Sequence, residues 1–262
     1  MKGEAIHPEW IVPDWRAPAQ VRAFVTTRAG GVSSGPYGAP SGGGMNVGLS
    51  TGDDVERVRT NRLRLRAALP AEPRWLRQVH GAVVVDAAAI EQPIEGDASF
   101  SSEPNVVCAV SIADCMPVFL ADELGRAVAV AHAGWRGLAA GVIQNSVAAL
   151  RARIGQPDAR LHAWLGPTIG PLRFEVGGEV LEAMQSRLPR ARDAFKPREG
   201  GKYLADLPAL ARQALGQVGV DQAGGGDLCT YSDPLRFYSY RRDRITGRHA
   251  AVIWLDSGRS LK

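Results

Sequence analysis

Short apolar runs alternate with amphipathic stretches along almost the whole chain. Runs rich in Val, Ile and Ala predict strands at Val21–Thr27, Trp75–Val79, Ala82–Asp86, Asn105–Ile112, Val118–Ala121, Arg126–Ala131, Leu161–Leu165, Leu228–Tyr231, Phe237–Arg241 and His249–Leu255. Helices are predicted from a cap at Asp53 or Asp54 to about Leu69 before Pro70, and over Leu138–Arg153, Glu175–Leu188 and Asp206–Val218. Strands outnumber helices, and several neighbouring strands are predicted to form hairpins; the last two strands are joined through Asp243–Gly247. The pattern therefore favours an α+β fold over a doubly wound parallel sheet.

The composition favours one domain, residues 1–262 with a core from about 21 to 256. The irregular stretch Gly30–Gly44 and the glycines at 224–226, predicted as a flexible connection, do not separate regions of different composition. No apolar run approaches the roughly 18–20 residues that span a bilayer. The first residues have no apolar signal segment, so we expect a cytoplasmic protein without membrane contact.

Charge and cysteine content narrow the function classes. The chain has 31 cations against 27 anions, and only four of the cations are Lys. Arg suits phosphate and carboxylate ligands, although a GC-rich genome also enriches it. Without a basic block interleaved with aromatics, we expect a small anionic ligand and no nucleic acid. Three cysteines without a C-x-x-C pair argue against a disulfide framework and against a zinc ribbon.

The strands before and after residues 122–125 predict a hairpin that brings a thiol and an imidazole together. With the turn midpoint between Glu123 and Leu124, Cys115 and His132 are equidistant from it. We therefore expect them to be cross-strand partners on one face, with Cβ atoms roughly 4.5–5.5 Å apart. A bulge at Pro117, which cannot donate to the ladder, would disturb this register.

A thiol beside an imidazole has three interpretations. The imidazolium can activate the thiol as a nucleophile, both groups can bind zinc, or the pair can be structural. Gly134-Trp135-Arg136-Gly137 leads from the strand directly into a helix, and free N–H groups there favour an anion site. His80 is a third candidate, and in a regular strand it shares a face with Gln78.

Five motifs in order resemble one family: Arg77-Gln78-Val79-His80-Gly81, Ala113-Asp114-Cys115-Met116-Pro117, His132-Ala133-Gly134-Trp135-Arg136-Gly137, Gly166-Pro167-Thr168-Ile169-Gly170 with Phe174-Glu175-Val176-Gly177, and Phe237-Tyr238-Ser239-Tyr240-Arg241-Arg242-Asp243. Together they resemble the YfiH-type laccase-domain family, formerly labelled polyphenol oxidase and associated with purine nucleoside phosphorylase activity. The resemblance implies a single-domain layered sandwich with mixed sheets flanked by helices, related to bacterial toxin cysteine deamidases of the CNF type.

The resemblance also implies an activity and a site. It implies phosphorolysis of adenosine, inosine and methylthioadenosine, and deamination of adenosine, with His80, Cys115 and His132 as zinc ligands and an open fourth position. For this chemistry we predict Arg28, Arg136 and Arg241 at phosphate, and Asn46 and Gln78 at sugar or base edges. Asp114 or Glu175 would shuttle protons. Copper is the less favoured metal, since a multicopper oxidase needs more than the five histidines present.

Two alternatives remain open. One is an amide hydrolase with Cys115 as nucleophile and His132 as base, acting on peptidoglycan precursors as the family connection implies. The other is a non-catalytic zinc or ligand-binding module, although a structural zinc site normally has four protein ligands. We expect purine nucleosides and phosphate as partners, and a monomer or homodimer.

Overall fold

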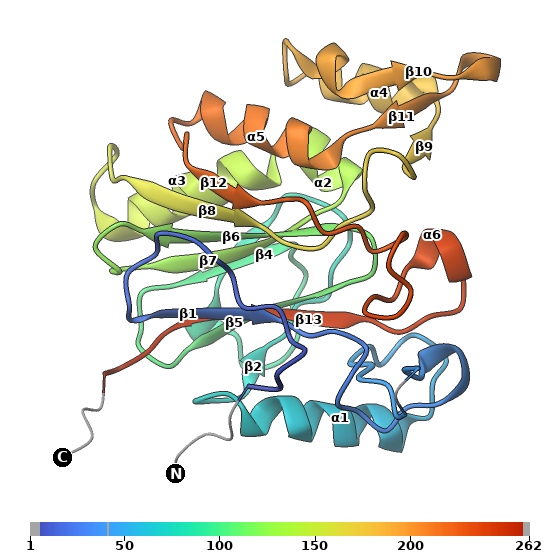
Figure 1. Cartoon of the computed structure of the whole chain (residues 1–262). Helices are drawn as coiled ribbons and strands as arrows, with labels where there is room; N and C mark the ends of the chain where they lie inside the picture. The colour runs from blue at the N-terminus through green and yellow to red at the C-terminus, as the bar shows by residue number, and fades with distance from the viewer. Residues whose placement is uncertain (1–5, 41, 259–262) are drawn as a thin grey trace.

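Two mixed β-sheets lie face to face in the middle of the molecule, and helices cover the outer face of each (Figure 1). The computed structural model describes residues 6–40 and 42–258. The four layers confirm the predicted α+β sandwich with mixed sheets. None of the helices in these residues is long and apolar enough to cross a membrane.

The larger sheet has six strands in the order β12-β8-β6-β7-β4-β3. Its central strands are antiparallel, whereas β12 and β3 pair in parallel with their neighbours at the edges. The strands are β3 (Val84–Asp86), β4 (Ala98–Ser101), β6 (Met116–Asp122), β7 (Val128–Ala133), β8 (Leu161–Leu165) and β12 (Ala223–Gly225).

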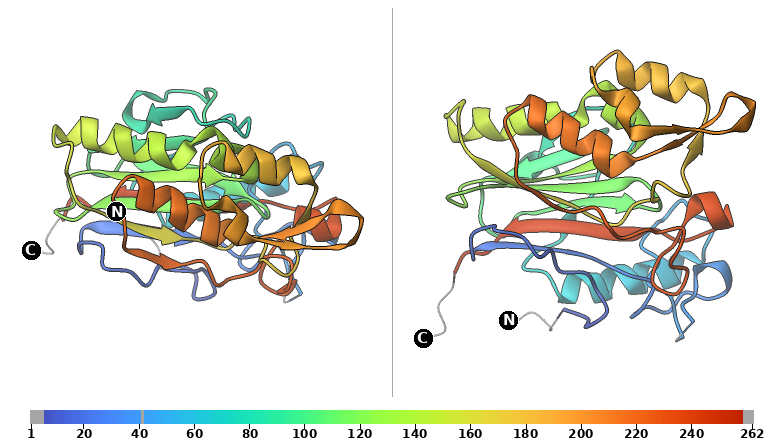
Figure 2. Two further views of the ribbon diagram at one scale, coloured as in Figure 1. Left: turned by 90° about the horizontal axis from the view of Figure 1, so that it is seen from above. Right: turned by 45° about the horizontal axis from the view of Figure 1, so that its top comes forward.

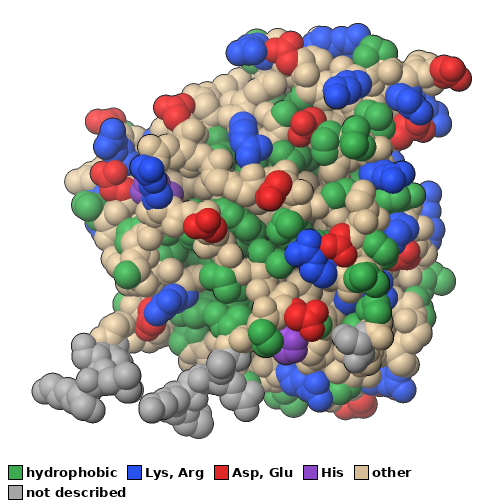
Figure 3. Space-filling view, in the orientation of Figure 1, with side chains coloured by type: hydrophobic (Ala, Val, Ile, Leu, Met, Phe, Trp, Pro, Cys, Tyr) green, Lys and Arg blue, Asp and Glu red, His purple; other side chains and the backbone are tan. Residues whose placement is uncertain are grey.

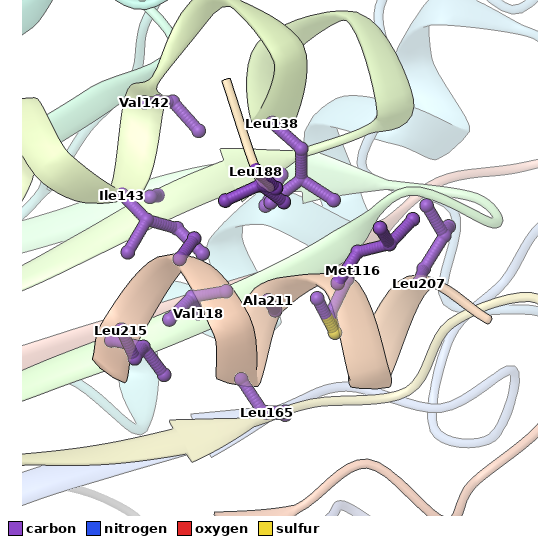
Figure 4. Packing of buried hydrophobic residues seen from close by; sticks show 14 of the residues in the cluster. Met116, Val118, Leu138, Val142, Ile143, Leu165, Leu188, Leu207, Ala211 and Leu215 are labelled. Carbon is purple, nitrogen blue, oxygen red and sulfur yellow. The ribbon is translucent and has the colours of Figure 1, made fainter. Parts of the chain in front are cut away.

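Four helices lie on the outer side of the six-stranded sheet. They are α2 (Trp135–Ala140), α3 (Val142–Ile154), α4 (Gly178–Gln185) and α5 (Leu207–Gln217). One of them, α4, packs against α2 rather than on the strands (Figure 1). Met116 and Val118 of β6 pack among Ala211 and Leu215 of α5, all buried (Figure 4). Because side chains alternate along a strand, Phe119 of β6 points the opposite way, into the core between the sheets.

The smaller sheet has the order β1-β13-β5-β2. Alternation again divides its side chains: Cys108 and Val110 of β5 face the larger sheet, whereas Val107 and Ala109 face α1. Its elements are β1 (Val21–Val25), β2 (Pro73–Arg74), β5 (Val107–Ile112), β13 (His249–Leu255) and the covering helix α1 (Val55–Ala67). Asp54 caps α1 as predicted, because its side chain accepts from the N–H groups of Glu56 and Arg57.

A third, three-stranded sheet and the short helix α6 (Tyr240–Asp243) lie at the same end of the molecule (Figures 1 and 2). The sheet consists of β9 (Glu175–Val176), β10 (Phe195–Pro197) and β11 (Tyr203–Ala205). Four 3₁₀ turns complete the described elements: η1 (Gly35–Tyr37), η2 (Ala87–Ala89), η3 (Ala191–Ala194) and η4 (Glu199–Gly201).

Three predicted strands are wrong. Trp75–Val79 is a loop in which Arg77 forms an isolated bridge with Glu95. Leu228–Tyr231 contributes one bridge, from Cys229 to Thr168. Phe237–Arg241 forms no hairpin with β13, because Ser239 caps α6 and the Arg242 guanidinium holds nearby loop carbonyls instead.

Two predicted helices and one predicted linker also differ. The helix over Leu138–Arg153 is divided, because Gly141 adopts φ +91° between α2 and α3. The helix over Glu175–Leu188 begins only at Gly178, since β9 takes its first residues. The glycines at 224–226 contribute to a parallel edge strand, β12, rather than a free linker.

Candidate functional site

The β6–β7 hairpin pairs Pro117, not Cys115, with His132. The predicted direct pairing is therefore wrong by two residues. The true midpoint lies one residue later, because the Asp122 N–H donates to the Ala127 carbonyl at 3.0 Å across a loop in which Gly125 has φ +68°. No bulge occurs at Pro117, since the register runs unbroken from Met116 to Ala121.

A shift of two residues leaves a side chain on the same face of the strand, so Cys115 and His132 still lie on one face of the sheet, as predicted. Cys115, just before β6, and His132 both project on the side of the four-stranded sheet. His80 reaches them from the loop between β2 and β3. The ligand atoms of His80, Cys115 and His132 all lie within 4.8 Å of one another. The structure thus brings together the three side chains that the resemblance implied.

The cluster opens to solvent on the side of His80. His132 is buried, Cys115 is half-buried and His80 is exposed. The two imidazole rings lie 4.8 Å apart between centroids, inclined by 65°. Three protein ligands, one of them exposed, are fewer than the four that close a structural zinc site.

Asp97, just before β4, contacts both histidine-bearing segments and was missed by the sequence analysis. Its carboxylate accepts from His132 Nδ1 at 2.9 Å and from the backbone N–H groups of Val79, His80 and Gly81. Asp97 lies 35 positions from His132 in a stretch for which we predicted no strand. A lone Asp before an unpredicted strand carries no sequence signal for this contact.

Cys115 and His132 shift each other's pKa through their opposite charges. Burial alone would raise the pKa of the Cys115 thiol, but the charge of His132 and hydrogen bonding to His132 and His80 lower it to about 6. Burial alone would lower the pKa of His132, but the Cys115 thiolate and the Asp97 carboxylate raise it to about 9. In the metal-free protein the two groups therefore form a thiolate–imidazolium pair at neutral pH.

We expect alkylation of Cys115 by iodoacetamide in metal-free protein to rise with pH around a midpoint near 6. The reason is that the thiolate is the nucleophile and its proton is lost at the lowered pKa of about 6. Mass spectrometry of the Cys115 peptide against pH measures the midpoint. The Cys115→Ala variant shows how much alkylation takes place at other residues. A midpoint near the ordinary thiol value of about 8.5 would contradict the ion pair.

Two residues predicted at substrate are occupied by structural hydrogen bonds. Gln78 pairs with Ser111, donating to its carbonyl at 2.9 Å and accepting from its N–H at 2.8 Å. Asn46 is buried, and its amide bonds to Thr51, Asp53 and two backbone N–H groups. Asn46 has both its donors and its acceptor engaged within the protein, and Gln78 has its acceptor and one N–H engaged.

The three predicted phosphate arginines differ in their surroundings. Arg28 donates to the carbonyls of Gly38 and Pro234, so all three nitrogens of its guanidinium are engaged within the protein. Arg241 donates through one nitrogen to the Glu175 carbonyl at 2.6 Å. Arg136 is exposed and stacks 4.3 Å from the Trp135 ring centroid. Lys and Arg side chains are frequent at the end of the molecule that carries α6 and the three-stranded sheet (Figure 3).

Asp114 ties the cluster to neighbouring loops. Its side chain accepts from the Thr230 hydroxyl and the Arg241 N–H, both at 2.6 Å, while its carbonyl accepts from Thr168 and Ile169. The residue adopts φ +85°, so the chain turns sharply immediately before Cys115. Glu175, the other predicted proton shuttle, accepts from Lys202 Nζ at 2.9 Å.

Arg248 is a second residue that the sequence analysis missed. It precedes β13, and its guanidinium donates to the carbonyls of Thr246 and Gly247. Burial lowers its pKa, and the opposite charges of Cys115 and Asp114 counteract this. A half-buried cation therefore acts electrostatically on the cluster.

Fold and cluster together define the class: a layered α+β protein with a three-ligand candidate metal centre beside a β-hairpin. The chain belongs to the YfiH-type laccase-domain family, since residues 22–256 match the family model described as multi-copper polyphenol oxidoreductase laccase. The part of the chain that the structure describes holds one cluster of three candidate ligands.

Proteins with established names are similar over nearly the full length. A purine nucleoside phosphorylase of Pseudomonas aeruginosa is 49% identical over 247 residues, covering 94% of this chain and 98% of the relative. The purine nucleoside phosphorylase YfiH of Escherichia coli K12 is 49% identical over 248 residues, with the same coverage.

Two solved structures share the fold. A Neisseria meningitidis protein of the DUF152 family is 45% identical with a TM-score of 0.87, covering 95% of this chain and 100% of that one. YlmD from Geobacillus stearothermophilus is 31% identical with a TM-score of 0.82, covering 91% of this chain and 93% of that one.

Proposed function

We propose that this protein is a zinc-dependent purine nucleoside phosphorylase acting on adenosine, inosine and methylthioadenosine. The observation that carries the proposal is the convergence of His80, Cys115 and His132 within 4.8 Å, with one side open to solvent. The names of the relatives at 49% identity support the reaction class. A cytoplasmic location and a monomeric or homodimeric state remain predictions.

The donor set fits zinc. A thiolate and two imidazoles are ligands that zinc accepts readily, and the carboxylate of Asp97 supplies the outer partner that metal-bound histidines commonly have. Copper would also accept these donors. A metal held here would supply a Lewis acid at the solvent-facing side of the cluster.

The chain's own residues would bind the anionic substrate. We propose Arg136 and Arg241 as phosphate contacts, because Arg136 is exposed beside the cluster strand and Arg241 uses one nitrogen on the Glu175 carbonyl. Roles for Arg28, Asn46 and Gln78 at substrate would require their present hydrogen bonds to exchange.

Adenosine incubated with the purified protein is expected to yield adenine and ribose 1-phosphate only when phosphate is present. Phosphate is the second substrate of the proposed reaction, so its omission removes the product entirely. Chromatography of the products measures both outcomes. Equal adenine release without phosphate would indicate hydrolysis and contradict phosphorolysis.

The proposal also includes deamination of adenosine to inosine. Deamination requires an activated water and a proton shuttle, and Asp114 is the proposed shuttle. Since both of its oxygens accept hydrogen bonds, one from Thr230 and one from Arg241, shuttling would break one of them. Release of inosine and ammonia without phosphate is the expected signature.

Amide hydrolysis is the second candidate, and the lowered pKa of the Cys115 thiol, about 6, favours it. In this candidate function Cys115 would be the nucleophile, His132 the base, and Asp97 the carboxylate that orients His132, as in a catalytic triad. The two candidates separate on treatment: chelation abolishes a metal-dependent reaction, whereas a thiol hydrolase survives chelation and is lost on alkylation of Cys115. Loss of stability on chelation, without turnover of any nucleoside, would instead indicate the non-catalytic zinc module.

A further inference from the structure

We infer that Asp97 is the positioning residue of the cluster, which sets both the direction of His80 and the ring nitrogen that His132 presents. The inference rests on the proposed role of the His80–Cys115–His132 cluster as the reactive site. It holds for a metal centre and for a thiol hydrolase alike, because each needs the same two imidazoles correctly oriented.

On the side of His80, the Asp97 carboxylate holds three successive backbone N–H groups. Val79 and Gly81 donate to Oδ2 at 3.2 and 2.7 Å, and His80 donates to Oδ1 at 2.9 Å. His80 adopts φ +61°, a left-handed conformation that is unfavourable for a residue with a Cβ. The three hydrogen bonds stabilise that turn, which directs the ring of His80 toward His132.

On the other side, Asp97 holds His132 at two points. Oδ1 accepts from Nδ1 at 2.9 Å, and the Asp97 carbonyl accepts from the His132 N–H at 2.7 Å. With Nδ1 engaged as a donor, Nε2 is the nitrogen left to face Cys115 and any bound metal. One carboxylate therefore chooses the tautomer of one histidine and the backbone turn of the other.

Asp97 is itself rigidly held and fully buried. Its side chain is 0% exposed, and its N–H donates to the Val83 carbonyl at 3.0 Å at the start of β4. Both carboxylate oxygens are used, with two donors on each. An amide in this place would keep one acceptor oxygen and turn an NH₂ group toward two N–H donors.

A loop anchor alone would explain the three backbone bonds but not the contact with His132 Nδ1. The test therefore compares Asp97→Asn with Asp122→Asn. Asp122 is also 0% exposed and accepts backbone N–H groups from Leu124 and Arg126, but it lies at the end of the β6–β7 hairpin away from Cys115. Both variants lose buried hydrogen bonds, so a purely structural effect appears in both.

The first measurement is the affinity of metal-free protein for Zn²⁺, by competition with a chromophoric chelator. We expect Asp97→Asn to bind Zn²⁺ about 10–100-fold more weakly than wild type, the range found when outer partners of metal ligands are lost. Asp122→Asn is expected to bind as wild type does. Equal Zn²⁺ affinity in Asp97→Asn and wild type, with a melting temperature lowered as in Asp122→Asn, would overturn the inference.

The second measurement is the tautomer of His132 in metal-free protein, from long-range ¹H–¹⁵N correlation at a pH above its raised pKa of about 9, where the imidazole is neutral. Wild type is expected to carry a proton on Nδ1, and Asp97→Asn to lose that preference. A wild-type His132 protonated on Nε2 alone would overturn the inference even if Asp97→Asn failed to fold. If wild type bound no Zn²⁺, the proposed metal function would fail, while this signature would still decide the role of Asp97.

Discussion

Replacing Cys115 with alanine is expected to lower phosphorolysis of adenosine by about 10³-fold or more. Cys115 supplies the single thiolate of the cluster, and its loss leaves two imidazoles to hold the metal. A catalytic metal contributes several kcal/mol to transition-state stabilisation, and about 1.4 kcal/mol corresponds to tenfold in rate. Initial rates of adenine release, together with the metal content of each sample, measure the effect.

Cys229→Ala is the matched control. Cys229 is also half-buried but lies by the Gly170 loop, where its sulfur accepts from the Gly170 N–H at 3.2 Å. This variant is expected to keep its metal and most of its rate. Activity in Cys115→Ala near that of Cys229→Ala would show that the reaction takes place elsewhere.

Gly134→Ala is expected to disable the same site without removing any ligand. A Cβ at Gly134 would lie 2.7 Å from Cys115 Sγ and 3.5 Å from His80 Nδ1. The backbone of Gly134 (φ −71°, ψ 170°) accepts alanine without strain, so the added methyl acts mainly through its close contact with the Cys115 sulfur. Since overpacking costs about 1–3 kcal/mol, we expect the sulfur to shift and Zn²⁺ affinity to fall by at least about tenfold.

Gly178→Ala, at the first position of α4, is the control for Gly134→Ala. A Cβ at Gly178 meets no atom within 4 Å, so this variant should match wild type in Zn²⁺ affinity and rate. Calorimetric Zn²⁺ titration of both variants makes the comparison. Wild-type affinity and rate in Gly134→Ala would mean that the Cys115 sulfur is not required where the structure places it.

The hairpin could be predicted because alternation and turn residues are local. Asp122 and Gly125 mark the turn, and the face shared by Cys115 and His132 follows from strand parity. The exact register could not be predicted, because it depends on the left-handed conformation of Gly125 (φ +68°) and on how the side chain of Asp122 engages the turn, through the N–H groups of Leu124 and Arg126. The predicted register was wrong by two residues, so the face on which Cys115 and His132 lie was correct, but the residue paired with His132 was wrong.

The position of His80 was inferred from the family motif, and no local pattern explains it. Its segment resembles a strand by composition, yet the Asp97 carboxylate, 17 residues later, draws three of its N–H groups into a turn. A long-range side-chain anchor of this kind overrides strand propensity. For the same reason, Phe237–Arg241 became a loop and helix once Arg242 engaged the carbonyls of Thr230 and Tyr231.

The most direct test of the account follows adenine release from adenosine in phosphate buffer while the bound metal is removed and then restored. We predict that release stops when a chelator has stripped the protein and returns on addition of Zn²⁺, in proportion to the metal bound. Adenosine that stays intact with fully loaded wild type, or release that continues in metal-free protein, would contradict a metal-dependent phosphorylase at His80, Cys115 and His132.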